Sequence, residues 1–144
     1  MRIAIGSDHR GFNLKTQIIN LLKEQGHEYK DCGCPNEESV DYPVIAKDVC
    51  ESVIAGDCNR GVLICGTGIG MSIAANKVRG IRAALCHNTF GAERARRHND
   101  ANILCLGAEE VPNNLPEIIT VFLTDPFEDG KHQRRLNIIK EIEG

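Results

Sequence analysis

Two short segments of the sequence gather side chains that could do acid–base chemistry. The first is GSDHRG at 6–11, which places the carboxylate of Asp8 and the imidazole of His9 between two glycines. The second is CGTGIGMS at 65–72, in which the thiol of Cys65 precedes three alternating glycines. An ionised thiol can act as a base or a nucleophile, and carboxylates and imidazoles can carry protons. Both segments are therefore candidate parts of a catalytic site.

The glycine segment is suited to holding a negatively charged oxygen. Its backbone N–H groups can converge on an anion, and a helix that begins there adds a partial positive charge. The same charge favours the thiolate form of Cys65. A cysteine taken alone is more often a small buried apolar residue, and Asp8 taken alone is more often a helix cap. The functional interpretation therefore depends on the neighbours of both residues.

Neither segment fits a nucleotide motif, and no metal motif is present. GSDHRG has the glycine spacing of a P-loop, but Phe and Asn follow at 12–13 where lysine and serine or threonine are required. The G-x-G-x-G pattern at 66–70 differs from the dinucleotide fingerprint, and the next expected strand ends without an acidic residue. Cys32 and Cys34 lack the two-residue spacer and the second pair of a zinc knuckle. We expect no cofactor and no metal.

Two basic clusters later in the chain are further candidates. His98 and Asn99 follow an arginine-rich segment, and Lys131 and Arg135 lie one helical turn apart. His98 could act as an acid, and the two cations could contact one phosphate. A solvated basic helix end is the plainer interpretation of each cluster.

The elements that must position these segments alternate along the chain. Short runs typical of β-strands occur at 2–5, 27–32, 62–65, 83–86 and 103–106. Segments with helical spacing or helix-start signals occur at 14–22, 41–55, 70–77, 89–97 and 112–123. Gly26 is expected to end the first helix, and Pro112 is expected in the first turn of the last of these helices.

This alternation predicts a parallel sheet covered by helices on both faces. We predict a Rossmann-like, three-layer α/β fold with a five-stranded parallel sheet, formed by residues 1–144 as a single domain. Ligands bind such sheets at the carboxyl ends of the strands, where both glycine segments lie. An extra C-terminal helix follows Gly130 and carries an apolar stripe of Leu136, Ile139 and Ile142. Because it lies outside the repeating units, we expect the stripe to pack on a second copy.

Composition narrows the range of partners. The 144 residues carry a formal net charge of −3, which offers no polycationic surface for nucleic acid. No apolar stretch approaches the roughly 20 residues of a membrane span. The N-terminus lacks the pattern of a signal peptide, and the seven cysteines are an odd number. We therefore expect free thiols and a cytoplasmic protein with neither nucleic-acid nor membrane partners.

Five motifs together resemble a known family. They are GSDHRGFNLK at 6–15, DYP at 41–43, CGTGIGMSIAANKVRGIRAAL at 65–85, RRHNDANILCLG at 96–107 and GKHQRR at 130–135. The chain resembles, almost end to end, the sugar-phosphate isomerase family that includes the type B ribose-5-phosphate isomerases and the galactose-6-phosphate isomerase subunits. The ribose enzymes are the nearer match, because the galactose subunits depart from CGTGIGMSIAANK and lack the HNDAN run.

The resemblance implies a cofactor-independent aldose–ketose isomerase that interconverts ribose 5-phosphate and ribulose 5-phosphate through a cis-enediolate. Cys65 would be the base, Thr67 would help to move the hydroxyl proton, and the amides of 66–70 would hold the enediolate. His98 would open the furanose ring, with Asp8 steering the hydroxyl groups. His9, Lys131 and Arg135 would clamp the phosphate. The full set of residues that the resemblance implies in substrate binding is His9, Tyr42, Gly66, Gly68, Ile69, Gly70, Asn99, Lys131 and Arg135.

The cleft of this family is shared between subunits, so the resemblance also implies a homodimer, and it allows a dimer of dimers. Two departures from the family pattern concern the phosphate. Lys131 replaces a frequent arginine and loses its bidentate fork, and Glu109 replaces a basic residue and would repel a phosphate. We therefore expect that six-carbon sugar phosphates or unphosphorylated aldoses are also accepted.

Two alternatives come from other functional classes. The glycine segment could belong to a non-catalytic phosphometabolite-binding module, which would bind a sugar phosphate without converting it. Cys32 and Cys34 could instead form the centre of a thiol redox protein, whose activity would follow the reduction state of that pair and not Cys65.

Overall fold

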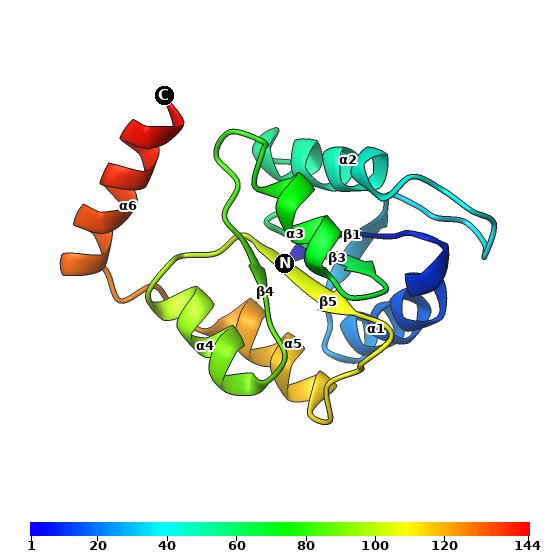
Figure 1. Cartoon of the computed structure of the whole chain (residues 1–144). Coiled ribbons are helices and arrows are strands. Elements are labelled where there is room, and N and C mark those ends of the chain that lie inside the picture. The colour runs from blue at the N-terminus through cyan, green and yellow to red at the C-terminus, as the bar shows by residue number, and fades with distance from the viewer.

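A computed structural model describes all 144 residues and shows one five-stranded sheet between two layers of helices (Figure 1). The strands are β1 (Arg2–Ser7), β2 (Glu28–Asp31), β3 (Arg60–Cys65), β4 (Ala83–Leu85) and β5 (Ile103–Gly107). All pairs are parallel, in the order β2-β1-β3-β5-β4. The predicted three-layer α/β fold is confirmed, and every predicted strand is present.

The helices are α1 (Phe12–Glu24), α2 (Tyr42–Ile54), α3 (Ile69–Ala75), α4 (Thr89–Arg97), α5 (Leu115–Thr124) and α6 (Lys131–Glu143). A short 3-10 turn at His9–Gly11 precedes α1. No helix combines the length and the apolar character that a membrane crossing requires. Gly26 follows α1 with a positive φ of 79°, as its expected role at the helix end predicts.

Each face of the sheet has its own apolar core. Val62 and Ile64 of β3 pack with α1, α4 and α5, whereas the alternate residues Leu63 and Cys65 pack with α2 and α3. Because both faces are buried, residues 61–65 of β3 and all of β5 lack polar side chains instead of alternating polar with apolar ones. This arrangement explains why these strands could be recognised from the sequence.

The start of α5 differs from the prediction. The expected helix begins at Pro112, but α5 begins at Leu115 and has Pro116 in its first turn. The backbone N–H of Ile118 donates to the carbonyl of Asn114 at 2.9 Å, which closes that first turn. The backbone N–H groups in the first turn of a helix have no partner within the helix, so a proline, which lacks this N–H, is tolerated there. Pro112 and Pro116 are therefore equally plausible residues for the first turn.

The strand order creates a crevice at the carboxyl edge of the sheet. The chain passes from β1 to β2 on one side and then to β3 on the other side of β1. The loops that follow β1 and β3 therefore diverge, which is where open α/β sheets bind ligands. Both glycine segments lie in these loops.

The outermost parts of the fold are the two edge strands and α6. β4 has three residues, and β2 has the sequence EYKD with no buried residue. α6 lies apart from the two helical layers, at the left of the molecule in Figure 1. Its Leu136 is buried against the body of the chain, whereas Ile139 and Ile142 are exposed.

Candidate active site

A pocket of about 360 Å³ lies at the carboxyl ends of β1 and β3, and we call it the Cys65 pocket. Its lining residues are Asp8, His9, Arg10, Ser39, Val40, Asp41, Tyr42, Cys65, Gly66, Thr67 and Gly70. Seven residues predicted from the sequence are thus brought together by three loops. Gly68 and Ile69 belong to the same glycine loop, with Ile69 facing a neighbouring pocket.

The thiol of Cys65 is held at the start of α3. Cys65 ends β3 and is 5% exposed, and its Sγ accepts a hydrogen bond from the Gly68 backbone N–H at 3.2 Å. A donor aimed at the sulfur stabilises a negative charge there. The backbone N–H groups of Gly66 and Thr67 have no acceptor within the chain. The loop can therefore serve both a thiolate and a nearby oxyanion.

Glycine is required at two positions of this loop by close contacts. Gly68 has φ of 80°, and a Cβ there would lie 2.5 Å from Cδ1 of Leu85 and 2.9 Å from the backbone of Leu106. A Cβ on Gly70 would lie 2.7 Å from the ring of Tyr42. The loop can turn back onto the sulfur, and the tyrosine can cover it, only because side chains are absent.

Asp8 and His9 are fixed by backbone groups. Oδ1 of Asp8 accepts hydrogen bonds from the N–H groups of Arg10 at 3.0 Å and Gly11 at 3.1 Å. Asp8 is thus the helix cap of the plainer interpretation, although it also lines the pocket. The Val40 N–H donates to Nδ1 of His9 at 3.4 Å, which makes Nδ1 the acceptor and Nε2 the ring donor.

Arg10 lines the pocket but was not among the predicted site residues. Its Nη1 lies 2.8 Å from Oε1 of Glu109, and more than half of each side chain is exposed. The pair lies next to Gly66: a Cβ added to Gly66 would lie 2.9 Å from Oε1 of Glu109. The charge of Glu109 is therefore balanced within the chain, where the sequence suggested simple repulsion of a phosphate. Arg10 belongs to the GSDHRG segment, so its position there was the available signal.

The remaining four predicted residues lie elsewhere in the chain, at the amino edge of the sheet. α4 runs antiparallel to the strands, so His98 and Asn99 follow it at the edge opposite to Cys65. The Asn99 carbonyl accepts a hydrogen bond from Nε of Arg82, the residue before β4, at 2.9 Å. The structure thus does not place His98, Asn99, Lys131 or Arg135 in the Cys65 pocket of the same chain.

These residues form a group of their own with the start of α6, and we call the five of them the His98 cluster: His98, Asn99, Lys131, His132 and Arg135. The rings of His98 and His132 stack with centroids 4.2 Å apart and planes 13° from parallel. Burial and the neighbouring His98 lower the pKa of His132. His132 was missed by the sequence analysis, although it lies between two residues that were chosen.

The potential metal ligands of the chain are His98, His132 and Glu128, whose donor atoms lie within 4.8 Å of one another. Oε2 of Glu128 is 3.8 Å from Nε2 of His98 and 3.7 Å from Nε2 of His132. In the stack, however, the two ring planes are nearly parallel, and each nitrogen lone pair lies in its own ring plane, so the two lone pairs do not point at one common position. A metal ion could bind both nitrogens only if the rings turned out of the stack.

The cysteines give little support to a redox centre. All seven are free, and Cys34 is buried with its thiol directed at the Asn36 carbonyl. Burial raises the pKa of Cys32, which lowers its thiolate fraction. Redox-active cysteines need the opposite shift. The redox interpretation of Cys32 and Cys34 therefore has no structural support.

Comparison with known proteins agrees with the fold and with the motifs. The Ribose/Galactose Isomerase family model matches residues 3–139. The chain is 44% identical to ribose-5-phosphate isomerase B of Escherichia coli, covering 99% of this chain and 96% of that protein. It is 43% identical to D-erythrulose-4-phosphate isomerase of Pectobacterium atrosepticum, covering 90% and 87%.

A solved structure shows the same architecture. Ribose-5-phosphate isomerase B of Clostridium thermocellum superposes with a TM-score of 0.96 at 51% identity, covering 99% of this chain and 97% of that one. Fold and sequence thus agree over nearly the whole length of both chains. The chain belongs to the Ribose/Galactose Isomerase family and is an isomerase.

Proposed function

We propose that the protein interconverts ribose 5-phosphate and ribulose 5-phosphate without a cofactor, through a cis-enediolate. The observation that carries this proposal is the position of the Cys65 thiol beside a glycine loop with free N–H groups. A base and an oxyanion site are the two requirements for moving a proton between adjacent carbons.

In the proposed reaction, Cys65 takes the proton from C2 of the open-chain aldose and returns it to C1. Electrons from the C2–H bond form the enediolate double bond, and negative charge develops on O1. The N–H groups of Gly66 and Thr67 stabilise that charge, because they have no competing acceptor. The Thr67 hydroxyl is suited to passing the O2 proton to O1, since its side chain is exposed to the pocket.

The proposed active site needs a second copy of the chain, because the Cys65 pocket and the His98 cluster lie at opposite edges of one sheet. An apolar groove of about 490 Å³ runs between α6 and the body, lined by residues that include Ile81, Ala83, Ile139 and Ile142. Another copy of the chain would bury the exposed side chains of Ile139 and Ile142. His98 of the partner subunit would then open the sugar ring, and the partner's Lys131 and the partner's Arg135 would hold the phosphate with His9.

The direct test is ketose formation from ribose 5-phosphate in metal-free buffer. We expect turnover by the unmodified protein and a loss of about 10³-fold in kcat for Cys65→Ala, because a positioned general base contributes roughly 10²–10⁴-fold. Sugar-phosphate binding, measured by calorimetry, should survive the substitution. Binding without conversion by the unmodified protein would favour the phosphometabolite-binding module instead.

The shared site has its own test, based on mixing two inactive variants. Cys65→Ala and His98→Asn are unfolded together, refolded together and assayed. In a symmetric dimer with shared clefts, each mixed dimer keeps one intact site, so activity should return to about a quarter of the unmodified level. A cleft built within one chain would give no recovery, and size-exclusion chromatography would show whether the dimer itself is present.

Substrate range is the finer part of the proposal. We propose that six-carbon sugar phosphates or free aldoses are also accepted, because the Arg10–Glu109 pair is exposed and can rearrange at little cost. Relatives at similar identity are named for a five-carbon and for a four-carbon sugar phosphate, so the number of carbons in the sugar is the variable to test. The values of kcat/KM for four-, five- and six-carbon aldose phosphates, and for free ribose, would decide it. Turnover of ribose 5-phosphate alone would refute the broader range.

A further inference from the structure

The turn that carries His98 and Asn99 has a backbone conformation that glycine adopts without strain. Asp100 has φ of 44°, and its N–H donates to the Arg96 carbonyl at 3.1 Å. Helices commonly end with a left-handed residue bonded in this way, and that residue is usually glycine. The chain has an aspartate where the backbone alone favours glycine, so its carboxylate requires an explanation.

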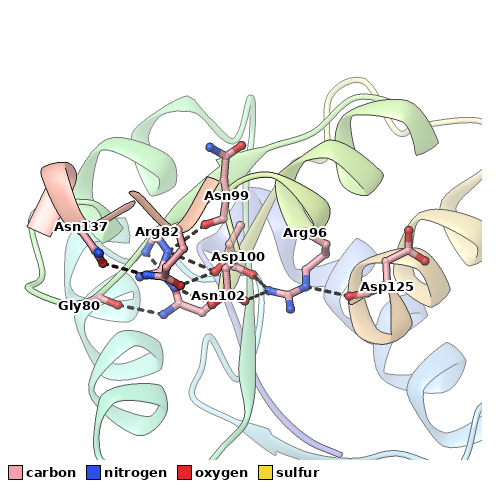
Figure 2. A network of polar contacts seen from close by, with 10 residues as sticks. Gly80, Arg82, Arg96, Asn99, Asp100, Asn102, Asp125 and Asn137 are labelled. Carbon is pink, nitrogen blue, oxygen red and sulfur yellow. Dashed lines mark hydrogen bonds and ion pairs between the residues drawn. The ribbon is translucent and has the colours of Figure 1, made fainter. Parts of the chain in front are cut away.

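The carboxylate of Asp100 lies between two arginines (Figure 2). Its Oδ1 accepts a hydrogen bond from Nη1 of Arg96 at 2.9 Å, and its Oδ2 accepts one from Nη2 of Arg82 at 3.2 Å. The side chain of Arg96 is only 5% exposed, and it also donates to the Ala101 carbonyl at 2.7 Å. A buried guanidinium needs a counter-charge, so the position of Asp100 is fixed by Arg96.

Arg82 holds the main chain of the same turn. Its Nε donates to the Asn99 carbonyl at 2.9 Å, and its Nη2 donates to the Asp100 carbonyl at 2.9 Å. The backbone N–H of Arg82 donates to Oδ1 of Asn102 at 2.8 Å, and Nδ2 of Asn102 donates to the Gly80 carbonyl at 2.9 Å. The planar guanidinium thus fastens the turn to the beginning of β4 (Figure 2).

The ring of His98 has few restraints besides this turn. About a third of its side chain is exposed, its closest ionic neighbour is Glu128 at 3.8 Å, and its ring rests on His132. The direction of the ring therefore depends on this stack and on the backbone that Arg82, Asp100 and Arg96 hold.

We infer that Arg82, Asp100 and Arg96 are positioning residues for ring opening by His98, an inference that rests on the proposed function. In ring opening the C1–O4 bond breaks, its electron pair goes to O4, O4 gains a proton and the O1 hydroxyl loses one. An imidazole that exchanges these protons must be placed within a fraction of an ångström. In the proposed shared site, the later proton transfer is made by Cys65 of the partner subunit and does not use the His98 imidazole.

The two directions of the reaction separate these steps. Ribose 5-phosphate is mostly a furanose and must be opened, whereas ribulose 5-phosphate is an open chain because its O5 carries the phosphate. In the reverse direction the aldehyde product can leave and cyclise in solution. A defect in ring opening should therefore slow the reaction of ribose 5-phosphate much more than the reaction of ribulose 5-phosphate.

The experiment compares initial rates in both directions for Asp100→Asn and Arg82→Lys. Asparagine also tolerates the left-handed conformation, so Asp100→Asn removes only the charge. Arg82→Lys keeps the charge and the Asp100–Arg96 pair but loses the planar fork, so this variant should fold even if the first does not. For both we expect kcat to fall at least about tenfold from ribose 5-phosphate and less than about threefold from ribulose 5-phosphate.

Two controls keep this inference separate from the proposed function. His98→Asn should show the same directional imbalance, and Cys65→Ala should slow both directions alike. If His98→Asn shows no imbalance, the proposed ring-opening role of His98 fails. If His98→Asn shows it, but Arg82→Lys slows both directions equally or neither, the positioning role is overturned.

Discussion

The Cys65 pocket is shaped by backbone packing, whereas the His98 cluster is shaped by charged side chains. In the pocket, a Cβ on Gly68 would collide with Leu85 and with the main chain of Leu106, so the loop has one conformation. In the cluster, Lys131 and Arg135 are exposed on one helix, and the preceding turn is held by ion pairs. The pocket is therefore part of the folded core, and the cluster can change without unfolding the chain.

The largest effect that tests this contrast is expected from Gly68→Ala. The added methyl group meets backbone atoms and requires a strained φ of 80°, so we expect a loss of about 2–4 kcal/mol in the free energy of unfolding. Urea denaturation measures the loss. Gly26→Ala is the matched control, because Gly26 has φ of 79° but open space around it, and it should cost only about 1 kcal/mol. Equal losses would show that the close packing of the loop is unimportant.

The second largest effect is expected in the His98 cluster, and it should change the affinity for substrate without changing stability. Replacing Arg135 by methionine would remove the charge-assisted contact that we propose between Arg135 and the phosphate, so KM for ribose 5-phosphate should rise about 10- to 100-fold. The melting temperature should not change, because the side chain is exposed. Arg134→Met, on the same helix and also exposed, is the control. A similar KM for both variants would mean that general basic charge, and not a clamp, attracts the substrate.

Lys131 offers the converse change in the same cluster. Lys131→Arg restores a planar fork that can contact a phosphate through two hydrogen bonds, so we expect KM to fall about two- to fivefold. Steady-state kinetics with ribose 5-phosphate measures the change. An unchanged KM would place Lys131 outside direct contact with the phosphate.

A smaller effect is expected at the rim of the pocket. Glu109→Gln removes the charge that holds Arg10 beside the glycine loop, and exposed pairs of this kind contribute less than about 1 kcal/mol. We expect unchanged stability and a fewfold change in KM. Glu51→Gln breaks an equally exposed pair with Lys47 far from the site, and should change neither quantity. If both variants behave alike, Arg10 does not contact the substrate.

The smallest effect concerns stability against pH. Burial and His98 lower the pKa of His132 from an ordinary value of 6.5, so the folded chain binds fewer protons at this site than the unfolded chain. The contribution of neutral His132 to the free energy of unfolding is then complete above pH about 6.5 and is lost as the pH falls below that value. The stability difference between pH 7.5 and 5.5 should shrink in His132→Gln and persist in His87→Gln, an exposed control. An unchanged difference in His132→Gln would contradict this explanation.

The sequence predicted the fold well because its signals were local. The central strands β3 and β5 are short, mostly apolar runs, and Gly26 marks the end of a helix in the place where the structure ends it. The start of α5 was placed wrongly because two prolines satisfy the same local rule. The pocket was also predictable, since the strand order brings loops after β1 and β3 to one crevice.

The contacts that the sequence could not supply join distant parts of the chain. Arg10 and Glu109 are 99 residues apart, and no periodicity indicates that their loops meet above Gly66. Arg82 and Asp100 likewise belong to separate units of the fold. The separation of His98 from Cys65, in contrast, could have been deduced. A residue that follows a helix in this alternating order lies at the edge opposite to a residue that follows a strand.

The edge strands have a consequence for how copies of the chain can associate. A sheet grows across its edges when an unpaired strand is long and uncharged, which is also how many proteins aggregate. Here one edge offers only the three residues of β4, and the other offers the alternating charges of Glu28, Lys30 and Asp31 in β2. Both edges thus disfavour continuation of the hydrogen-bond ladder from one copy to the next. If copies of the chain associate as we propose, they should do so through helix surfaces, which favours a closed assembly over a fibre.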